Sequence, residues 1–183
     1  MNTKIDLFDK LVRFLAIKPL AAEPFDLEKA RAVIKEENKD DISFVGQHGY
    51  FEDVLDTVQQ RTGNIDLNQG VLYVYIKGQD SRKRVERNLL SIVLNVDKIF
   101  IVGKAEDWSF NDPKIKFLDI ESEFAENHQR FLIFNSPSYN VALVARHTSA
   151  GADRRIEAAL TNKKEAVSYA SQVLAPFSYQ KQF

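Results

Sequence analysis

Apolar residues recur at two spacings along the chain, and the order of these spacings predicts a layered fold of helices and strands. Spacing of i, i+3, i+4 and i+7, typical of a helix that buries one face, fills five segments. These predicted helices cover residues 5–15, 27–37, 50–62, 82–95 and 163–174. Asp26 is the expected N-cap of the second helix, since its carboxylate can accept the free N–H groups of Glu28 and Lys29. A less regular apolar pattern over 121–129 also favours a helix.

Short runs rich in β-branched and aromatic residues lie between the helices and predict strands. They cover residues 42–46, 71–76, 98–102, 115–118, 131–134, 141–145 and 155–160. The runs 71–76 and 98–102 are almost wholly apolar, as in strands that are covered on both faces. Because helix 82–95 joins them, we predict a βαβ unit with 71–76 in the centre of the sheet. Segments 131–134 and 141–145 predict an antiparallel hairpin.

Together these elements predict an α/β fold in a single domain over residues 1–183. We expect a mixed central sheet of about five or six strands with helices packed on it, and a C-terminal β-hairpin and helix. A chain of 183 residues is long enough to bury one sizeable core. Gly, Ser and Thr cluster only at 147–151, in a turn too short to separate two domains.

Charge and cysteine content narrow the class of protein. Lys and Arg number 25 against 26 Asp and Glu, so the net charge of −1 creates no overall field for nucleic acid or an anionic membrane. The longest apolar runs, such as 89–94, are far shorter than the roughly 20 residues that cross a bilayer. The N-terminus lacks the features of a secretory signal, and the absence of cysteine fits a reducing compartment. We therefore expect a cytoplasmic protein without nucleic-acid partners or membrane insertion.

No motif of a known reaction is present. The glycines form neither a G-x-G-x-x-G nor a Walker pattern, and no G-x-S-x-G elbow occurs. His48, His128 and His147 lie far apart and lack the spacing of metal ligands. Glu121 and Glu123 lie in a charged segment and are expected to be solvated. We therefore expect no catalytic residue, no metal and no cofactor, and a protein that is not an enzyme.

One glycine marks a place where an anion could bind. Gly78 follows a strong strand and precedes helix 82–95, for which Asp80 or Ser81 is the expected N-cap. An anion there could meet free N–H groups at the start of the helix, but Asp80 would repel it. An ordinary strand-to-helix turn is the favoured interpretation.

Five aromatic residues are candidate ligand contacts. Tyr73 and Tyr75 share one face of the central strand, and with Trp108, Phe110 and Tyr139 they could line a pocket for a planar ligand. Packing in the core is the alternative, and the commoner fate of such residues.

Four cations at the start of helix 82–95 are candidate partner contacts. Arg82, Lys83, Arg84 and Arg87 lie in the first two turns, where the helix dipole disfavours positive charge. Either acidic neighbours such as Asp80 and Glu86 offset this cost on a solvated face, or a negatively charged partner docks there.

A resemblance to a known family rests on two stretches and on the order of the elements. Residues 134–146, Phe-Asn-Ser-Pro-Ser-Tyr-Asn-Val-Ala-Leu-Val-Ala-Arg, resemble the sensory domain called DICT, and 158–167 are similar to its last strand and helix. Members occur in bacterial and archaeal signalling proteins beside output modules such as diguanylate cyclases or kinases. The resemblance implies a sensory role without catalysis. Since 183 residues leave no room for an output module, we expect action through a separate partner protein.

The sequence thus favours a noncatalytic sensory or regulatory domain in signal transduction. It would bind a small ligand or a signalling partner through the hairpin, the loop around Trp108 and the basic start of helix 82–95. Two alternatives stay open. One is a structural or adaptor subunit that assembles through an apolar face, with homo-oligomers as a consequence, and the other is an enzyme whose site only the fold assembles.

Overall fold

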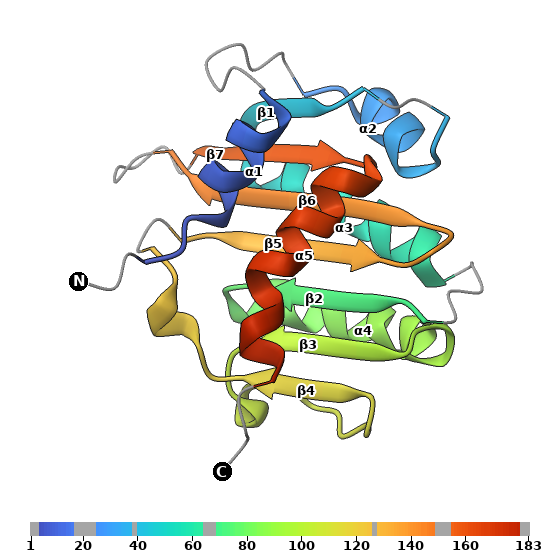
Figure 1. Ribbon diagram of the computed structural model, residues 1–183, viewed down its shortest axis with the longest axis vertical. Coiled ribbons are helices and arrows are strands. Elements are labelled where there is room, and N and C mark those ends of the chain that lie inside the picture. Colours follow the sequence, from blue (N-terminus) through green and yellow to red (C-terminus); the bar gives the residue numbers. More distant parts are fainter. Residues whose placement is uncertain are drawn as a thin grey trace.

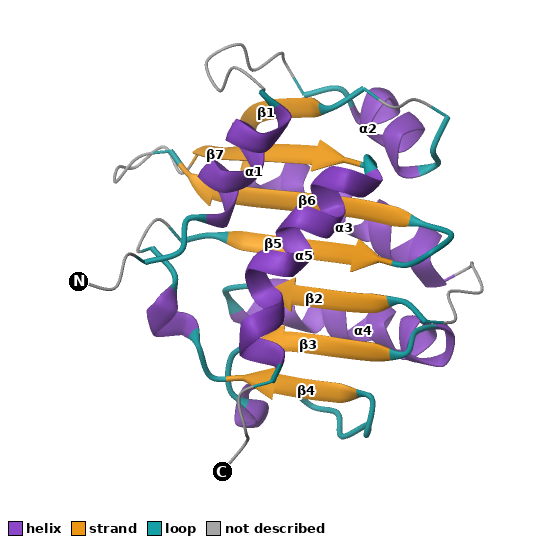
Figure 2. Cartoon of the chain, viewed as in Figure 1, coloured by secondary structure: helices purple, strands orange, loops and turns teal. Residues whose placement is uncertain are grey.

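The structure, a computed structural model, describes residues 4–16, 25–37, 40–63, 69–125, 128–148 and 155–179. Within these residues seven strands form one mixed sheet with helices on both faces, as Figures 1 and 2 show. This confirms the α/β class predicted from the apolar pattern. The sheet has seven strands where we expected five or six. Residues 149–151 of the turn predicted at 147–151 lie outside the described ranges.

The bounds of the elements follow the predicted segments closely. The strands are β1 (Ile42–Gln47), β2 (Val71–Tyr75), β3 (Lys98–Val102), β4 (Ile115–Leu118), β5 (Arg130–Asn135), β6 (Asn140–His147) and β7 (Arg155–Thr161). The helices are α1 (Leu7–Leu15), α2 (Leu27–Ile34), α3 (His48–Gly63), α4 (Gln79–Asn95) and α5 (Lys164–Ser178). None of the described helices combines the length and the apolarity that a membrane span requires.

The strand order is β1-β7-β6-β5-β2-β3-β4. The sheet changes character at β2, which pairs parallel with β3 on one side and antiparallel with β5 on the other. α4 joins β2 to β3, so the predicted βαβ unit is confirmed. The predicted hairpin is also confirmed, because β5 and β6 pair antiparallel up to Asn135 and Asn140 at the turn. The C-terminal helix, α5, follows β7.

Two helical layers bury the two faces of the sheet. α2, α3 and α4 cover one face, whereas α1 and α5 cover the other, with α5 running across the strands (Figure 1). Successive residues of a strand point to opposite faces, so Leu72 and Val74 face the first layer while Tyr73 and Tyr75 face the second. β2 is therefore buried on both sides, as its apolar run predicted.

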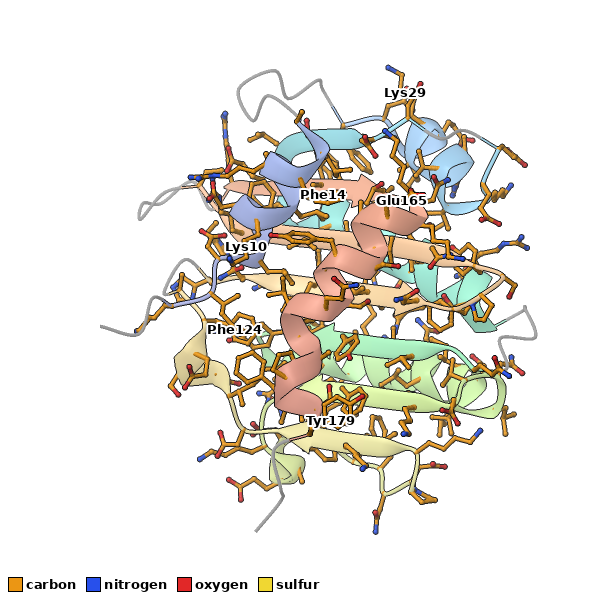
Figure 3. All side chains as sticks on the ribbon, viewed as in Figure 1. Lys10, Phe14, Lys29, Phe124, Glu165 and Tyr179 are labelled. Carbon is orange, nitrogen blue, oxygen red and sulfur yellow. The ribbon has the colours of Figure 1, made fainter. Side chains whose placement is uncertain are left out.

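A side-chain cap stabilises the start of α2, and a ring contact holds the end of α1 against α5. Asp26 Oδ1 accepts the N–H groups of Glu28 and Lys29 at 3.0 and 3.2 Å, which confirms the predicted cap of α2. In the other layer Phe14 of α1 lies toward α5, where its ring stacks on Tyr169 with 4.7 Å between centroids (Figure 3). Apolar contact between the two helices thus adds to their burial on the sheet.

The helix predicted over 121–129 is wrong within the described residues. Only a 3₁₀ turn, Glu121–Glu123, forms there. Phe124 then leaves the turn to pack its ring 5.2 Å from Tyr75 and 5.7 Å from Phe131, and its backbone bridges to Ile5 (Figure 3). Burial of this aromatic ring and pairing with the N-terminal segment outweigh the weak helical pattern.

Two leucines of α4 test the orientation of this helix on the sheet. Leu89→Ala should lower the free energy of unfolding by about 2–5 kcal/mol, because Leu89 is 0% exposed in the core. The matched control, Leu94→Ala, should change it by no more than about 0.5 kcal/mol, because Leu94 is 80% exposed. Urea denaturation of both variants gives the comparison. Equal losses would contradict the described face of α4.

Candidate functional site

A cavity of about 420 Å³ lies at the carboxyl end of β2, beside the start of β5 and the end of β6. The turn between β2 and α4, the first turn of α4 and the side chain of Glu52 from α3 complete its wall. Here the chain leaves β2 through α4 toward β3, while the neighbouring strand β5 runs in the opposite direction. Crevices beyond the carboxyl ends of strands, where connections diverge, are the usual ligand sites of α/β sheets.

Gly78 shapes the floor of this cavity. Its φ of 93° lies in a region that favours glycine, and it is the N-cap of α4, without a side-chain hydrogen bond to the helix. The prediction of Asp80 or Ser81 as N-cap is therefore wrong, because the glycine turn starts the helix earlier, at Gln79. The first N–H groups of α4 lack a side-chain cap, and the residues that carry them line the cavity.

A polar cluster formed by Glu52, Ser81 and Arg84 joins α3 to α4 in the cavity wall. Ser81 Oγ donates a hydrogen bond of 2.6 Å to Glu52 Oε1, and the Glu52 side chain is only 7% exposed. Arg84 Nη1 lies 3.8 Å from Glu52 Oε2, and Arg84 Nη2 lies 2.6 Å from Asp56 Oδ2 and 3.6 Å from Asp53. The hydrogen bond to Asp56 is the main cause that raises the pKa of Arg84. Charge-assisted bonds of this kind hold a wall in one geometry.

Three further basic residues come from other elements. Lys77 Nζ lies 5.4 Å from the centroid of the Tyr75 ring, at the end of β2. Arg130 is the first residue of β5, and His147 is the last residue of β6. The His147 ring meets the His128 ring edge-on, 5.5 Å between centroids. Arg84 contacts three carboxylates of α3, and Lys77 and Arg130 are two further cations that line the cavity. Their positive charge favours a negatively charged group there.

The five candidate aromatic residues do not share a pocket. Tyr73 and Tyr75 lie under α1 and α5, whereas Trp108, Phe110 and Tyr139 lie on the face covered by α2, α3 and α4. The predicted common pocket must be corrected, because the sheet itself separates the two groups. Each group packs in its own core: the rings of Trp108 and Phe110 are 5.7 Å apart, and Tyr139 donates a 2.9 Å hydrogen bond to the Ile34 carbonyl.

The four candidate cations at the start of α4 divide into two pairs. Arg82 lies 3.0 Å from Asp107, and Arg84 contacts the carboxylates of α3, so acidic residues from other segments offset the dipole. The predicted helper Glu86 instead accepts the N–H of Ser109 at 2.7 Å. Lys83 and Arg87 are exposed and form no ion pair with a described residue.

Sequence reasoning missed Glu52, Lys77, Arg130 and His147, which four separate segments bring to one cavity. Gly78 marked this place in the sequence, and Arg84, which the sequence offered as a partner contact, also lines the cavity. As for metals, no group of three His, Asp or Glu suited to an ion occurs in the part of the chain that the structure describes. The side chain of His48 lies outside that description.

Comparison with known proteins gives a distant structural match. No protein-family model and no curated protein matches the chain. Among solved structures, a chain of TrmBL2, described as an archaeal chromatin protein with a novel mode of DNA binding, matches with a TM-score of 0.47 and 11% identity. The match covers 95% of this chain and 60% of the TrmBL2 chain, so the chain spans less than two thirds of its length. A likeness at this level carries no functional argument.

The expectation that nucleic-acid partners are absent is withdrawn, because the net charge alone does not exclude them. That expectation rested on the net charge of −1, which sums over the whole chain. Phosphate binding depends on local groups of cations, which a sum over the chain does not reveal.

Replacing Arg84 tests the described cluster. Arg84→Gln should lower the free energy of unfolding by about 1–3 kcal/mol, because it removes the cation from the buried Glu52 carboxylate and from Asp56. Lys83→Gln, on the same helix but exposed, should change it by less than about 0.5 kcal/mol. Urea denaturation at low salt measures both, and an Arg84→Gln variant as stable as the control would refute the cluster.

Buried phenols predict how stability depends on alkaline pH. Burial is the main cause that raises the pKa of Tyr73, Tyr75 and Tyr139 above 10.0, since it favours the neutral phenol. The unfolded chain loses these protons from about pH 10, so the stability they contribute is full below pH 10 and declines as the pH rises further.

Above pH 10, Tyr75→Phe should therefore make the loss of stability with pH less steep by about 1 kcal/mol per pH unit. The reason is that the variant has one buried phenol fewer to titrate. Tyr179→Phe is the control, since Tyr179 is 85% exposed. Urea denaturation between pH 9 and pH 11.5 measures the slopes. A Tyr75→Phe slope equal to that of the control would show that the phenol is not buried as described.

Proposed function

We propose that this protein is a noncatalytic sensory or regulatory domain that binds a small polar ligand carrying a negatively charged group. The ligand site is the cavity at the carboxyl end of β2. The observation that carries the proposal is the gathering of Lys77, Arg130 and the uncapped first turn of α4 around this one cavity. A cavity of about 420 Å³ has the size that small metabolites occupy.

The charges of the wall define the ligand. Lys77 and Arg130 offer ammonium and guanidinium donors, and the N–H groups of the first turn of α4 add partial positive charge. Asp80 lies on the same wall, so the ligand also needs a hydroxyl or amino group that can donate to its carboxylate. A carboxylate or phosphate with neighbouring donor groups meets both requirements.

α4 connects this cavity to an exposed surface that a partner protein could contact. Its first turn lines the cavity, while its outer side exposes Lys83, Arg87, Leu90 and Leu94. A ligand that binds one arrangement of α3 and α4 more tightly than another would shift the population of this surface. The sequence resemblance to the DICT sensory family agrees with such a role, in which a separate protein partner receives the signal.

Binding of small anions tests the proposal. Isothermal titration with inorganic phosphate and with D-glycerate should show saturable binding to the wild-type chain. Lys77→Gln should weaken it about tenfold or more, because a charge-assisted hydrogen bond is lost. The matched control is Lys83→Gln, which removes the same charge on the exposed side of α4. Equal affinities of the two variants, or no saturable binding at all, would contradict the proposed site.

A second candidate function, an enzyme with a site assembled by the fold, has one specific observation in its favour. A hydroxyl, a carboxylate and an imidazole line the same cavity, in Ser81, Glu52 and His147. A fluorophosphonate probe tests it, since an activated serine would attack phosphorus and release fluoride. Labelling that Ser81→Ala abolishes would favour the enzyme over the sensory domain. Absence of labelling would remove this candidate.

A further inference from the structure

A second cavity, of about 460 Å³, lies at the other end of the central strands. The amino end of β2, the turn between β5 and β6 and one side of α5 enclose it. The first cavity lies where β2 ends and β5 begins, whereas this one lies where β2 begins and β5 ends. A ligand in one cavity therefore shares no contact residue with a ligand in the other.

Hydroxyl and amide groups dominate the polar lining of the second cavity. Its hydroxyls belong to Tyr73, Ser136, Ser168 and Ser171, and its amides to Gln69, Asn135 and Gln172. Val71, Pro137 and Ala175 provide apolar surface. Such alternation of donors, acceptors and apolar surface suits a compact ligand with several hydroxyl groups.

Among the residues that line this cavity, Ser171 has a buried hydroxyl without a hydrogen bond inside the described fold. Its side chain is buried, with 8% of the residue exposed, and its Oγ has no hydrogen-bond partner among the described residues. A buried helical hydroxyl normally donates to the carbonyl four residues earlier, as Thr62 does to Val58 at 2.7 Å. A buried hydroxyl without a hydrogen bond lowers the stability of the fold. This indicates that a group from outside the chain forms a hydrogen bond with it.

Two other hydroxyls of the lining, those of Ser136 and Tyr73, have hydrogen-bond contacts within the fold. Ser136 Oγ donates to the Tyr139 carbonyl at 2.9 Å and accepts the Tyr139 N–H at 2.8 Å, so it stabilises the hairpin turn. The Tyr73 hydroxyl lies 3.3 Å from Ser178 Oγ. These contacts fix part of the cavity wall, whereas Ser171 is a buried lining hydroxyl with an unused hydrogen bond.

Of the described residues that line this cavity, Lys164 is the charged one, and none carries a carboxylate. It lies in the first turn of α5, is exposed, and forms no ion pair with a described residue. The helix dipole adds positive potential at this end of α5. The electrostatics of the second cavity therefore favour a ligand with a single negative charge.

We propose that the second cavity binds a small hydroxyl-rich monocarboxylate of the sugar-acid class. Lys164 pairs with the carboxylate, and Ser171 hydrogen-bonds a ligand hydroxyl after rotation about its χ1 angle. The site is independent of the first cavity, so the proposed function can fail without affecting it, and the reverse also holds.

Titration followed by NMR tests this site in the whole chain. D-gluconate, D-glucuronate and L-threonate are the probes, and D-glucose and acetate are the controls that lack the charge or the hydroxyls. At least one probe should shift the amide signals of Gln69, Ser136 and Ser168 in a saturable way, and the controls should bind at least about tenfold more weakly. Absence of saturable shifts with all three probes would overturn the proposal.

Two variants separate a ligand contact from a structural role. Ser171→Ala should weaken binding of the probe about fivefold or more while the melting temperature stays equal or rises, because a buried hydroxyl without a partner is removed. Lys164→Gln should weaken it about tenfold or more, and Lys116→Gln, an exposed lysine of β4, is the matched control. Unchanged binding in Ser171→Ala and Lys164→Gln, or a lower melting temperature in Ser171→Ala, would overturn the assignment.

Discussion

β2 is covered by helices on both faces of the sheet, and all five of its side chains are apolar or aromatic. Burial of both faces places this strand in the interior of the sheet and requires a helical layer on each side. It also fixes the neighbours, since β2 pairs parallel with β3 through the α4 connection and antiparallel with β5 from the hairpin. Each end of β2 is therefore a place where the connections to neighbouring strands diverge.

The two cavities lie at those two ends. At the carboxyl end the wall is charged and is held by the contacts of Glu52 with Ser81 and Arg84. At the amino end the wall is mostly uncharged, with hydroxyl and amide groups and Lys164 as its cation. Because α4 begins in the first cavity and α5 lines the second, a ligand in either would contact a helix that covers the sheet. Under the proposed function, a bound ligand would act on the exposed surface of such a helix.

The fold could largely be predicted from sequence, because it depends on local patterns. The apolar runs predicted the central strands, the Asp26 cap predicted the start of α2, and the neighbouring segments 131–134 and 141–145 predicted the hairpin. The candidate site could not be predicted in this way, since Glu52, Lys77, Arg130 and His147 come from four separate segments. The grouping of Tyr73 with Trp108 failed because Tyr73 points from β2 toward α1 and α5, whereas Trp108, in the loop after β3, packs on the opposite face of the sheet. The helix predicted at 121–129 failed because a tertiary contact of Phe124 outweighs its local pattern.

The central claim is that the cavity at the carboxyl end of β2 retains a small anionic metabolite. Native mass spectrometry of the freshly purified chain tests it most directly, because it reports bound mass and oligomeric state together. We predict a species heavier than the bare chain by the mass of one small organic acid or phosphate ester, which is absent from a Lys77→Gln, Arg130→Gln double variant of unchanged fold. A bare chain in both proteins, or the same added mass in both, would contradict the account.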